Sequence, residues 1–163
     1  MQEVPFSVAR ILEFGTTAHG NTTCTTWRAS GAEETTFGEI GARATAFANA
    51  LHDDLGIDGD QRVSTLLYNC AEHVEVMFAV AAKGAVFNPL NVQLMADQIA
   101  YVVNHAESEV IVTDPRLAEK LGAILQLCPD VRAVAFTGIA PLDDAASHLP
   151  PSVEVYSLSL IHI

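Results

Sequence analysis

Between Thr36 and Asp114 the chain repeats one unit three times: an amphipathic helix followed by a short apolar strand. Strands that alternate with helices of about ten to twenty residues predict right-handed βαβ crossovers. The strands show no regular alternation of polar and apolar residues, which is typical of strands buried on both faces. The pattern therefore predicts an α/β fold with a mostly parallel sheet and helices on both faces. The spacing is too irregular for a solenoid.

The helix of the first unit has a clear beginning and a clear end. The Thr36 hydroxyl can accept a hydrogen bond from the Glu39 N–H while the Glu39 side chain reaches back, which makes a capping box. Apolar residues recur at helical spacing as far as Leu55. Gly56 follows, and glycine readily adopts the left-handed conformation that ends a helix. A buried strand is predicted next, over residues 62–68.

The next units follow the same design with different start signals. Asn69 and Glu72 suggest a second capping box, and Met95 caps the third helix poorly. Asp114 and Pro115 together are a strong start for a further helix. The predicted elements are a helix ending near Gly84, a strand at 85–90, a helix at 96–106, a strand at 109–113, a helix stopped by Pro129, a strand at 131–137 and a loop at 138–151.

The first 40 residues predict a smaller element beside the main sheet. Apolar residues on one face indicate a short helix at about 7–14. A β-branched segment at 22–28 and a returning segment at 34–37 predict an N-terminal β-hairpin, with its turn at 29–33.

Composition excludes several classes of protein. A net charge of −12, with eight Lys and Arg against twenty acids, argues against nucleic-acid binding. The longest apolar stretch, 76–90, is interrupted by Lys83 and is too short to span a membrane. Three widely spaced cysteines and the lack of a secretory signal favour a cytoplasmic protein. The histidines show no metal-ligand spacing, and no serine lies in a GxSxG motif.

Four segments, taken in order, resemble the N-terminal part of the adenylate-forming enzymes, the group of acyl-CoA synthetases, luciferases and adenylation domains. The segments read TTFGEIGARATAFANAL, LGIDGDQRV, NCAEHVEVMFAVAAKGAVFNPLN and QIAYVVNHAESEVIVTD. The resemblance covers about residues 7–140 and is closest to bacterial fatty-acyl-CoA synthetases, because of VARILEFG and the NxxEHxE helix start. It implies that ATP and a carboxylate give an acyl adenylate and pyrophosphate, and that CoA then displaces AMP. ATP, Mg and CoA are implied for the full-length family.

The chain does not contain the parts of this family that carry the chemistry. A loop of the form (S/T)SGTTGxPKG, which would hold a triphosphate through backbone N–H groups and a Lys, does not occur, nor does the C-terminal catalytic Lys. Lys83 and Lys120 are expected to be solvated. We therefore expect residues 1–157 to be the N-terminal part of the AMP-binding domain, inactive alone and without a cofactor or catalytic residue of its own. LSLIHI, residues 158–163, is expected to be a non-native tail.

The resemblance suggests a few substrate-pocket positions. Asn69, Glu72 and His73 match the family's pattern at a helix start that the resemblance places near the mouth of an acyl pocket; capping and a structural histidine are the alternatives. Asn91 matches the family's xPLNPRL segment, and its alternative role is a turn after the strand. Gln93 stands where this segment has an Arg that can face CoA phosphates, and an amide cannot pair with phosphate as a charge.

Three functions remain open at this point. The first is a fragment of an ATP-dependent fatty-acid–CoA ligase, whose small-molecule substrates would be a fatty acid, ATP and CoA. The second is a fragment of a ligase for another carboxylate. The third is a non-catalytic α/β interaction module. A generic doubly wound nucleotide binder would need a GxGxxG motif, which does not occur.

Overall fold

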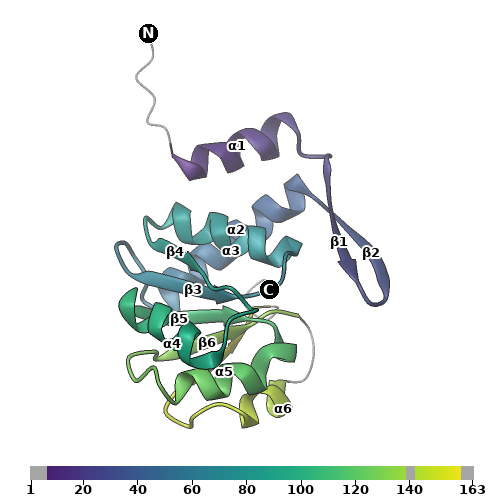
Figure 1. The fold of residues 1–163 in the computed structure, drawn as a ribbon. Coiled ribbons are helices and arrows are strands. Elements are labelled where there is room, and N and C mark those ends of the chain that lie inside the picture. The colour runs from purple at the N-terminus through teal and green to yellow at the C-terminus, as the bar shows by residue number, and fades with distance from the viewer. Residues whose placement is uncertain (1–6, 139–141, 159–163) are drawn as a thin grey trace.

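A parallel five-stranded sheet forms the centre of the computed structural model, which describes residues 7–138 and 142–158 (Figure 1). The strands lie in the order β4-β3-β5-β6-β7, and each neighbouring pair is parallel. Their bounds are β3 Arg62–Leu66, β4 Val86–Pro89, β5 Ser108–Thr113, β6 Ala133–Phe136 and β7 Glu154–Ser157. The prediction of a mostly parallel sheet is confirmed.

Helices cover both faces of this sheet, as predicted (Figure 1). Helices α2 (Phe37–Asp53) and α3 (Ala71–Ala82) cover one face, and α4 (Ala96–His105) and α5 (Ala118–Leu125) cover the other. Along β5, Val110 and Val112 belong to the core under α2 and α3, whereas Ile111 belongs to the core under α4 and α5. Successive side chains of a strand point to opposite faces, so burial of both faces removes the polar–apolar alternation.

The N-terminal elements form a further layer outside α2 and α3. Helix α1 (Val8–Ala18) packs on α2 and α3, and the antiparallel hairpin of β1 (Thr23–Arg28) and β2 (Gly31–Thr36) projects beside them (Figure 1). Helix α1 is longer than the expected segment 7–14. The hairpin turn is shorter than expected, because Arg28 already pairs with Gly31.

The helix start at Thr36 is confirmed as a capping box. The Glu39 N–H donates to Thr36 Oγ1 at 3.2 Å, and the Thr36 N–H donates to Glu39 Oε2 at 2.8 Å. Gly56 has φ +62°, in the left-handed region expected after the helix. These contacts are local in sequence, so short-range reasoning could find them.

The structure differs from the sequence analysis in the last third of the chain. The expected loop 138–151 contains helix α6 (Leu142–Ser147), whose first turn holds Asp143 and Asp144. Two carboxylates near a helix N-terminus are favourable, a signal that the loop interpretation overlooked. Asp114 does act as a cap, but for the 3-10 turn η1 (Pro115–Leu117) that precedes α5.

Two further expectations concern single residues. Lys120 is not simply solvated, because its Nζ donates to the carbonyls of Val92 and Leu94 at 2.7 and 2.6 Å. Leu158, at the start of the expected tail, is buried in the core under α2 and α3. Residues 159–163 lie outside the described residues, so a non-native tail stays a prediction.

Candidate functional site

A cavity of about 280 Å³ lies between the first half of α3 and the edge strand β4. Most of its lining is apolar, and its polar groups are an amide, a thiol and an imidazole. It is lined by Asn69, Cys70, His73, Val74, Met77, Phe87 and Pro89. Cys70, Val74 and Met77 recur at helical spacing on one side of α3. The cavity thus brings together two of the predicted pocket residues, Asn69 and His73, but its lining includes neither Glu72 nor Asn91.

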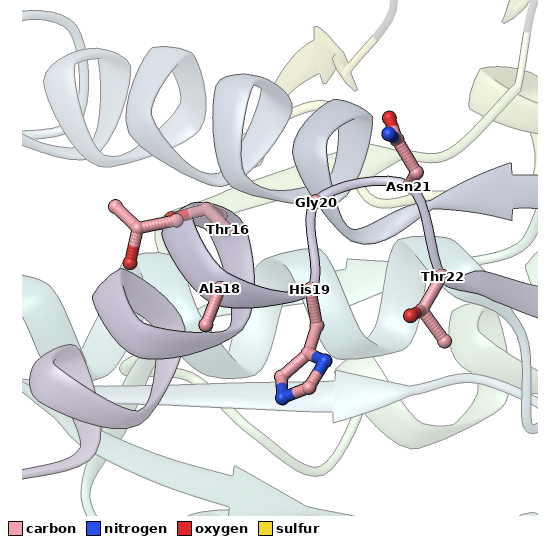
Figure 2. A pocket seen from close by; sticks show the side chains of 7 residues that line it. Thr16, Ala18, His19, Gly20, Asn21 and Thr22 are labelled. Carbon is pink, nitrogen blue, oxygen red and sulfur yellow. The ribbon is translucent and has the colours of Figure 1, made fainter.

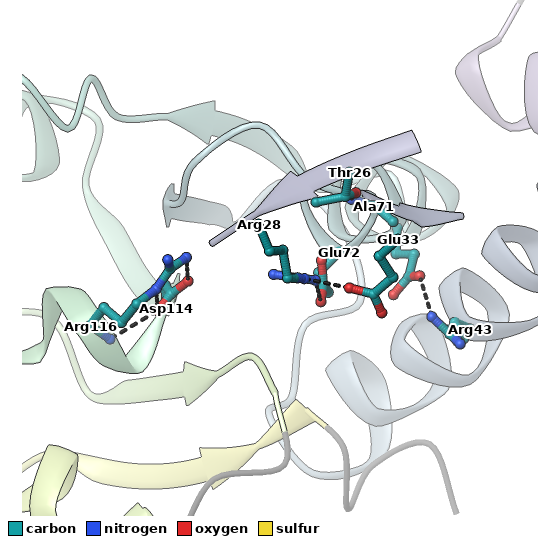
Figure 3. Close-up of polar contacts among 9 residues, drawn as sticks. Thr26, Arg28, Glu33, Arg43, Ala71, Glu72, Asp114 and Arg116 are labelled. Carbon is teal, nitrogen blue, oxygen red and sulfur yellow. Dashed lines mark hydrogen bonds and ion pairs between the residues drawn. The ribbon is translucent and has the colours of Figure 1, made fainter. Parts of the chain in front are cut away.

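The start of α3, which forms the cavity wall, is capped by a distant residue. The N-cap is Cys70, whose side chain makes no capping hydrogen bond. Instead, the Ala71 N–H donates to Thr26 Oγ1 of β1 at 3.0 Å (Figure 3). The capping box expected from Asn69 and Glu72 is therefore wrong, because Glu72 is only two residues past the N-cap. The hairpin supplies the acceptor that Asn69 was expected to provide.

Glu72 points away from the cavity and into an ionic cluster with the hairpin. Its Oε1 accepts from Arg28 Nη2 at 2.6 Å, and Arg28 also pairs with Glu33 across the hairpin (Figure 3). Burial opposes ionisation of Glu72, but hydrogen bonds from its own backbone and from Cys70, together with Arg28, lower its pKa overall. Glu72 therefore fixes the hairpin to α3 as a carboxylate.

Cys70 lines the cavity but is poorly suited to be a nucleophile. Burial, with the nearby Glu72 carboxylate, raises the pKa of the Cys70 thiol to about 12. The thiolate is the reactive form of cysteine, and this environment disfavours it. Cys70 therefore contributes a small, uncharged and polarisable side chain to the lining of the cavity.

His73 is held as a neutral wall residue. Its Nε2 lies 2.8 Å from Thr65 Oγ1, and its ring lies against Phe87 with centroids 5.7 Å apart. Burial lowers the pKa of His73, against a hydrogen bond to the Tyr68 backbone that raises it. These partners fix the orientation of the neutral imidazole, which adds a weakly polar group to the lining of the cavity.

Asn91 and Gln93 lie in the exposed turn after β4. Asn91 Oδ1 accepts from the Gln93 N–H at 2.9 Å, which is the geometry of an Asx turn. Both side chains are exposed. The two bonds from Lys120 to Val92 and Leu94 hold this same turn against α5. A substrate role for Asn91 stays a prediction.

A larger hollow of about 460 Å³ follows α1, at residues 16–22 (Figure 2). It is lined by threonines, small residues, His19 and Asn21, and it contains no cluster of charges. It lies at the last turn of α1 and the loop that leads to β1, and none of the predicted pocket residues lines it. The apolar cavity beside α3 is the better candidate because apolar walls with a few polar groups are typical of small-molecule sites.

Two kinds of site are not found in the part of the chain that the structure describes. Residues 7–138 and 142–158 hold no group of three or more His, Cys, Asp or Glu side chains placed to bind a metal ion. Within the same ranges, no helix is both long and apolar enough to cross a bilayer.

Sequence reasoning missed most of the residues that form the site. The stripe of Cys70, Val74 and Met77 follows helical spacing, but this spacing alone does not distinguish a cavity lining from the core. Phe87 and Pro89 face this stripe only because β4 pairs in parallel with β3, at Val63 and Thr65. The contacts of Arg28 with Glu72 and of Thr26 with Ala71 could not be predicted from local sequence, because the partners are more than 40 residues apart.

Comparisons with known proteins agree with this architecture. A protein-family model described as AMP-binding enzyme matches residues 13–154. A 3-methylmercaptopropionyl-CoA ligase of Ruegeria lacuscaerulensis is 27% identical over 157 residues, which are 96% of this chain and 29% of that protein. A long-chain-fatty-acid–CoA ligase of Thermus thermophilus is 40% identical over 90 residues, which are 55% of this chain and 16% of that protein.

Solved structures show the same fold. A crystal structure described as a putative long-chain-fatty-acid CoA ligase of Rhodopseudomonas palustris superposes with a TM-score of 0.74 at 24% identity, over 96% of this chain and 36% of that one. The chain therefore spans well under half the length of the relatives that it matches.

Proposed function

Because the chain belongs to the AMP-binding enzyme family, we propose that it is the N-terminal part of an ATP-dependent ligase that joins a fatty acid to CoA. In this reaction a carboxylate oxygen attacks the α-phosphorus of ATP, and pyrophosphate leaves. The CoA thiol then attacks the acyl carbon of the adenylate, and AMP leaves. The complete ligase would act in the cytoplasm on small molecules.

The apolar cavity beside α3 is the observation that carries the fatty-acid assignment. Val74, Met77 and Phe87 offer hydrocarbon surface, and burial of each methylene of an acyl chain is worth about 0.8 kcal/mol. The polar groups at the cavity, Asn69 and neutral His73, need no charged partner. We propose that this cavity forms part of the wall of the acyl subsite.

The nucleotide chemistry would come from another part of such a ligase. ATP, Mg and CoA are used by the family, and residues 7–138 and 142–158 hold no group of three or more His, Cys, Asp or Glu side chains placed to bind a metal ion. Lys120 is a cation that could bind a phosphate, but its Nζ donates to the backbone carbonyls of Val92 and Leu94. We therefore propose that this chain is inactive by itself.

A second candidate is a ligase for a short carboxylate. A relative that aligns over 96% of the chain is named as a 3-methylmercaptopropionyl-CoA ligase, whose acid is a short thioether. The same cavity would accept such a group beside Met77. The two candidates differ in the acid chain length that a completed enzyme prefers.

Pyrophosphate exchange tests the first part of the proposal. The chain, ATP, Mg²⁺ and a fatty acid should give no exchange above a blank without protein. Exchange above that blank would overturn the proposal of inactivity. A chimaera that joins residues 1–157 to the downstream part of the Thermus ligase should form acyl-CoA.

Substitutions in that chimaera test the cavity. Met77→Trp fills the cavity and should shift the preferred acid to a shorter chain. Met95→Trp makes the same change on an exposed residue outside the cavity and should leave the preference unchanged. An unchanged chain-length profile for Met77→Trp would rule out the cavity as part of the acyl subsite, and a peak at short acids in the unmutated chimaera would favour the second candidate.

A further inference from the structure

Glu75 is a buried carboxylate that the proposed chemistry does not use. Its side chain is 1% exposed in the contact between α3 and α2. Oε1 lies 3.3 Å from Arg43 Nη1 of α2, at the long end for an ion pair with hydrogen-bond geometry. Oε2 is buried and has no hydrogen-bond partner among the residues that the structure describes. A buried carboxylate that is only half paired is costly in its charged form.

The other charges around Glu75 do not complete its pairing. Glu72, one turn earlier on α3, repels a charge at Glu75. Strand β1 brings Arg28 to α3, but this guanidinium is engaged by Glu72 and Glu33. Helix α1 also packs on α3, and its charged residues pair with each other at the surface, Arg10 with Glu13 at 3.9 Å.

Glu75 and the candidate site lie on different sides of one helix. Val74 and Met77 line the cavity, whereas Glu75 faces α2. The same helix therefore forms both the wall of the cavity and the contact with α2 that Glu75 enters. Arg43 is 46% exposed, so water screens the attraction that it offers.

We propose that Glu75 is a proton-controlled latch: when it is neutral it lets α2 pack tightly on α3, and when it is ionised it loosens this contact and the cavity wall that α3 forms. The ionised Glu75 carboxylate then draws in water or pulls Arg43 inward. No described residue at the contact between α2 and α3 donates a hydrogen bond to Oε2 of Glu75.

The pH range follows from the environment of this group. Burial raises the pKa of Glu75 from 4.5 to about 7, with Arg43 opposing the shift and Glu72 adding to it. A folded-state pKa above the unfolded one means that the folded chain keeps a proton that the unfolded chain has released. The stability that this group contributes is thus complete below pH 4.5 and declines as pH rises towards 7.

Two variants and one titration test the latch on the full chain. In urea unfolding, the folding constant of the wild type should fall by roughly 100-fold more between pH 5 and 8 than that of Glu75→Gln. Glu34→Gln, at an exposed carboxylate, should keep the wild-type dependence. Equal pH dependence in the wild type and Glu75→Gln would overturn the proposal.

A direct titration keeps the test decisive if Glu75→Gln does not fold. In the wild-type chain with ¹³C-labelled glutamate, the side-chain carboxyl of Glu75 should titrate near neutral pH, and a midpoint near 4.5 would overturn the proposal. Amide exchange in α2, compared between wild type and Glu75→Gln at each pH, reports the loosening itself. The wild-type exchange rate divided by the rate of Glu75→Gln should rise at least tenfold from pH 5 to pH 8. A constant ratio would exclude a latch.

Discussion

The hydroxyl of Thr26 accepts a hydrogen bond from the backbone N–H of Ala71 at 3.0 Å, across 45 residues of sequence. Both groups are buried. The contact gives α3 the cap that its own N-terminal residues lack, and it fixes the hairpin to the start of α3 (Figure 3). This part of the chain lines the candidate cavity. The position of the cavity wall therefore depends on a layer that precedes the main sheet in sequence.

Removal of this cap should destabilise the fold measurably. Thr26→Val keeps the shape of the side chain but leaves the Ala71 N–H without its acceptor, at a cost of about 1 kcal/mol, as for other lost caps. Thr25→Val changes the neighbouring exposed threonine and should cost much less. Chemical denaturation measures both, and equal losses would show that the Thr26 cap contributes nothing specific.

The ion pair of Arg28 and Glu72 should be worth more than a surface pair. The side chains of Arg28 and Glu72 are 29% and 20% exposed, so Arg28→Met leaves a largely buried carboxylate without its cation. We expect a loss of about 1–3 kcal/mol at pH 7. The double variant Arg28→Met with Glu72→Gln should recover part of it. No recovery in denaturation measurements would mean that the pairing is not the cause.

Glu72 and Glu75 should respond to pH in opposite ways, although they are three residues apart. The pKa of Glu72 is lowered, so its stabilising effect is present above its ordinary value of 4.5 and is lost as pH falls through the folded-state pKa. Glu72→Gln should therefore weaken the loss of stability in acid. Unfolding measured below pH 5 checks this, and an unchanged acid slope would contradict it.

Two buried glycines should differ in their tolerance of a methyl group. A Cβ on Gly122 would lie 2.2 Å from the backbone carbonyl of His148, whereas a Cβ on Gly41 would lie 2.2 Å from a side-chain methyl of Thr16. Overpacking against backbone should cost about 1–3 kcal/mol in Gly122→Ala. Gly41→Ala should cost less although both glycines are buried, because the Thr16 side chain can rotate. Thermal melts of both variants decide the order.

Local contacts were the part of the fold that could be predicted. The bonds between Thr36 and Glu39 span three residues, and the glycine after α2 adopts its left-handed turn beside the residues that it ends. The parallel sheet followed from the order of helices and strands, because connection rules leave few topologies. Helix α6 was missed because its six residues are too few for a periodic pattern.

The sequence by itself determined the family resemblance, the alternation of helices and strands, and the lack of a triphosphate loop within these 163 residues. Tertiary structure decided the cap of α3, the partners of Lys120 and Glu75, and the place of Met77 and Phe87 in the lining of one cavity. The physical reason is range. Propensity and capping by neighbouring residues act over a few residues, whereas burial and the supply of distant hydrogen-bond partners depend on which segments the fold brings together.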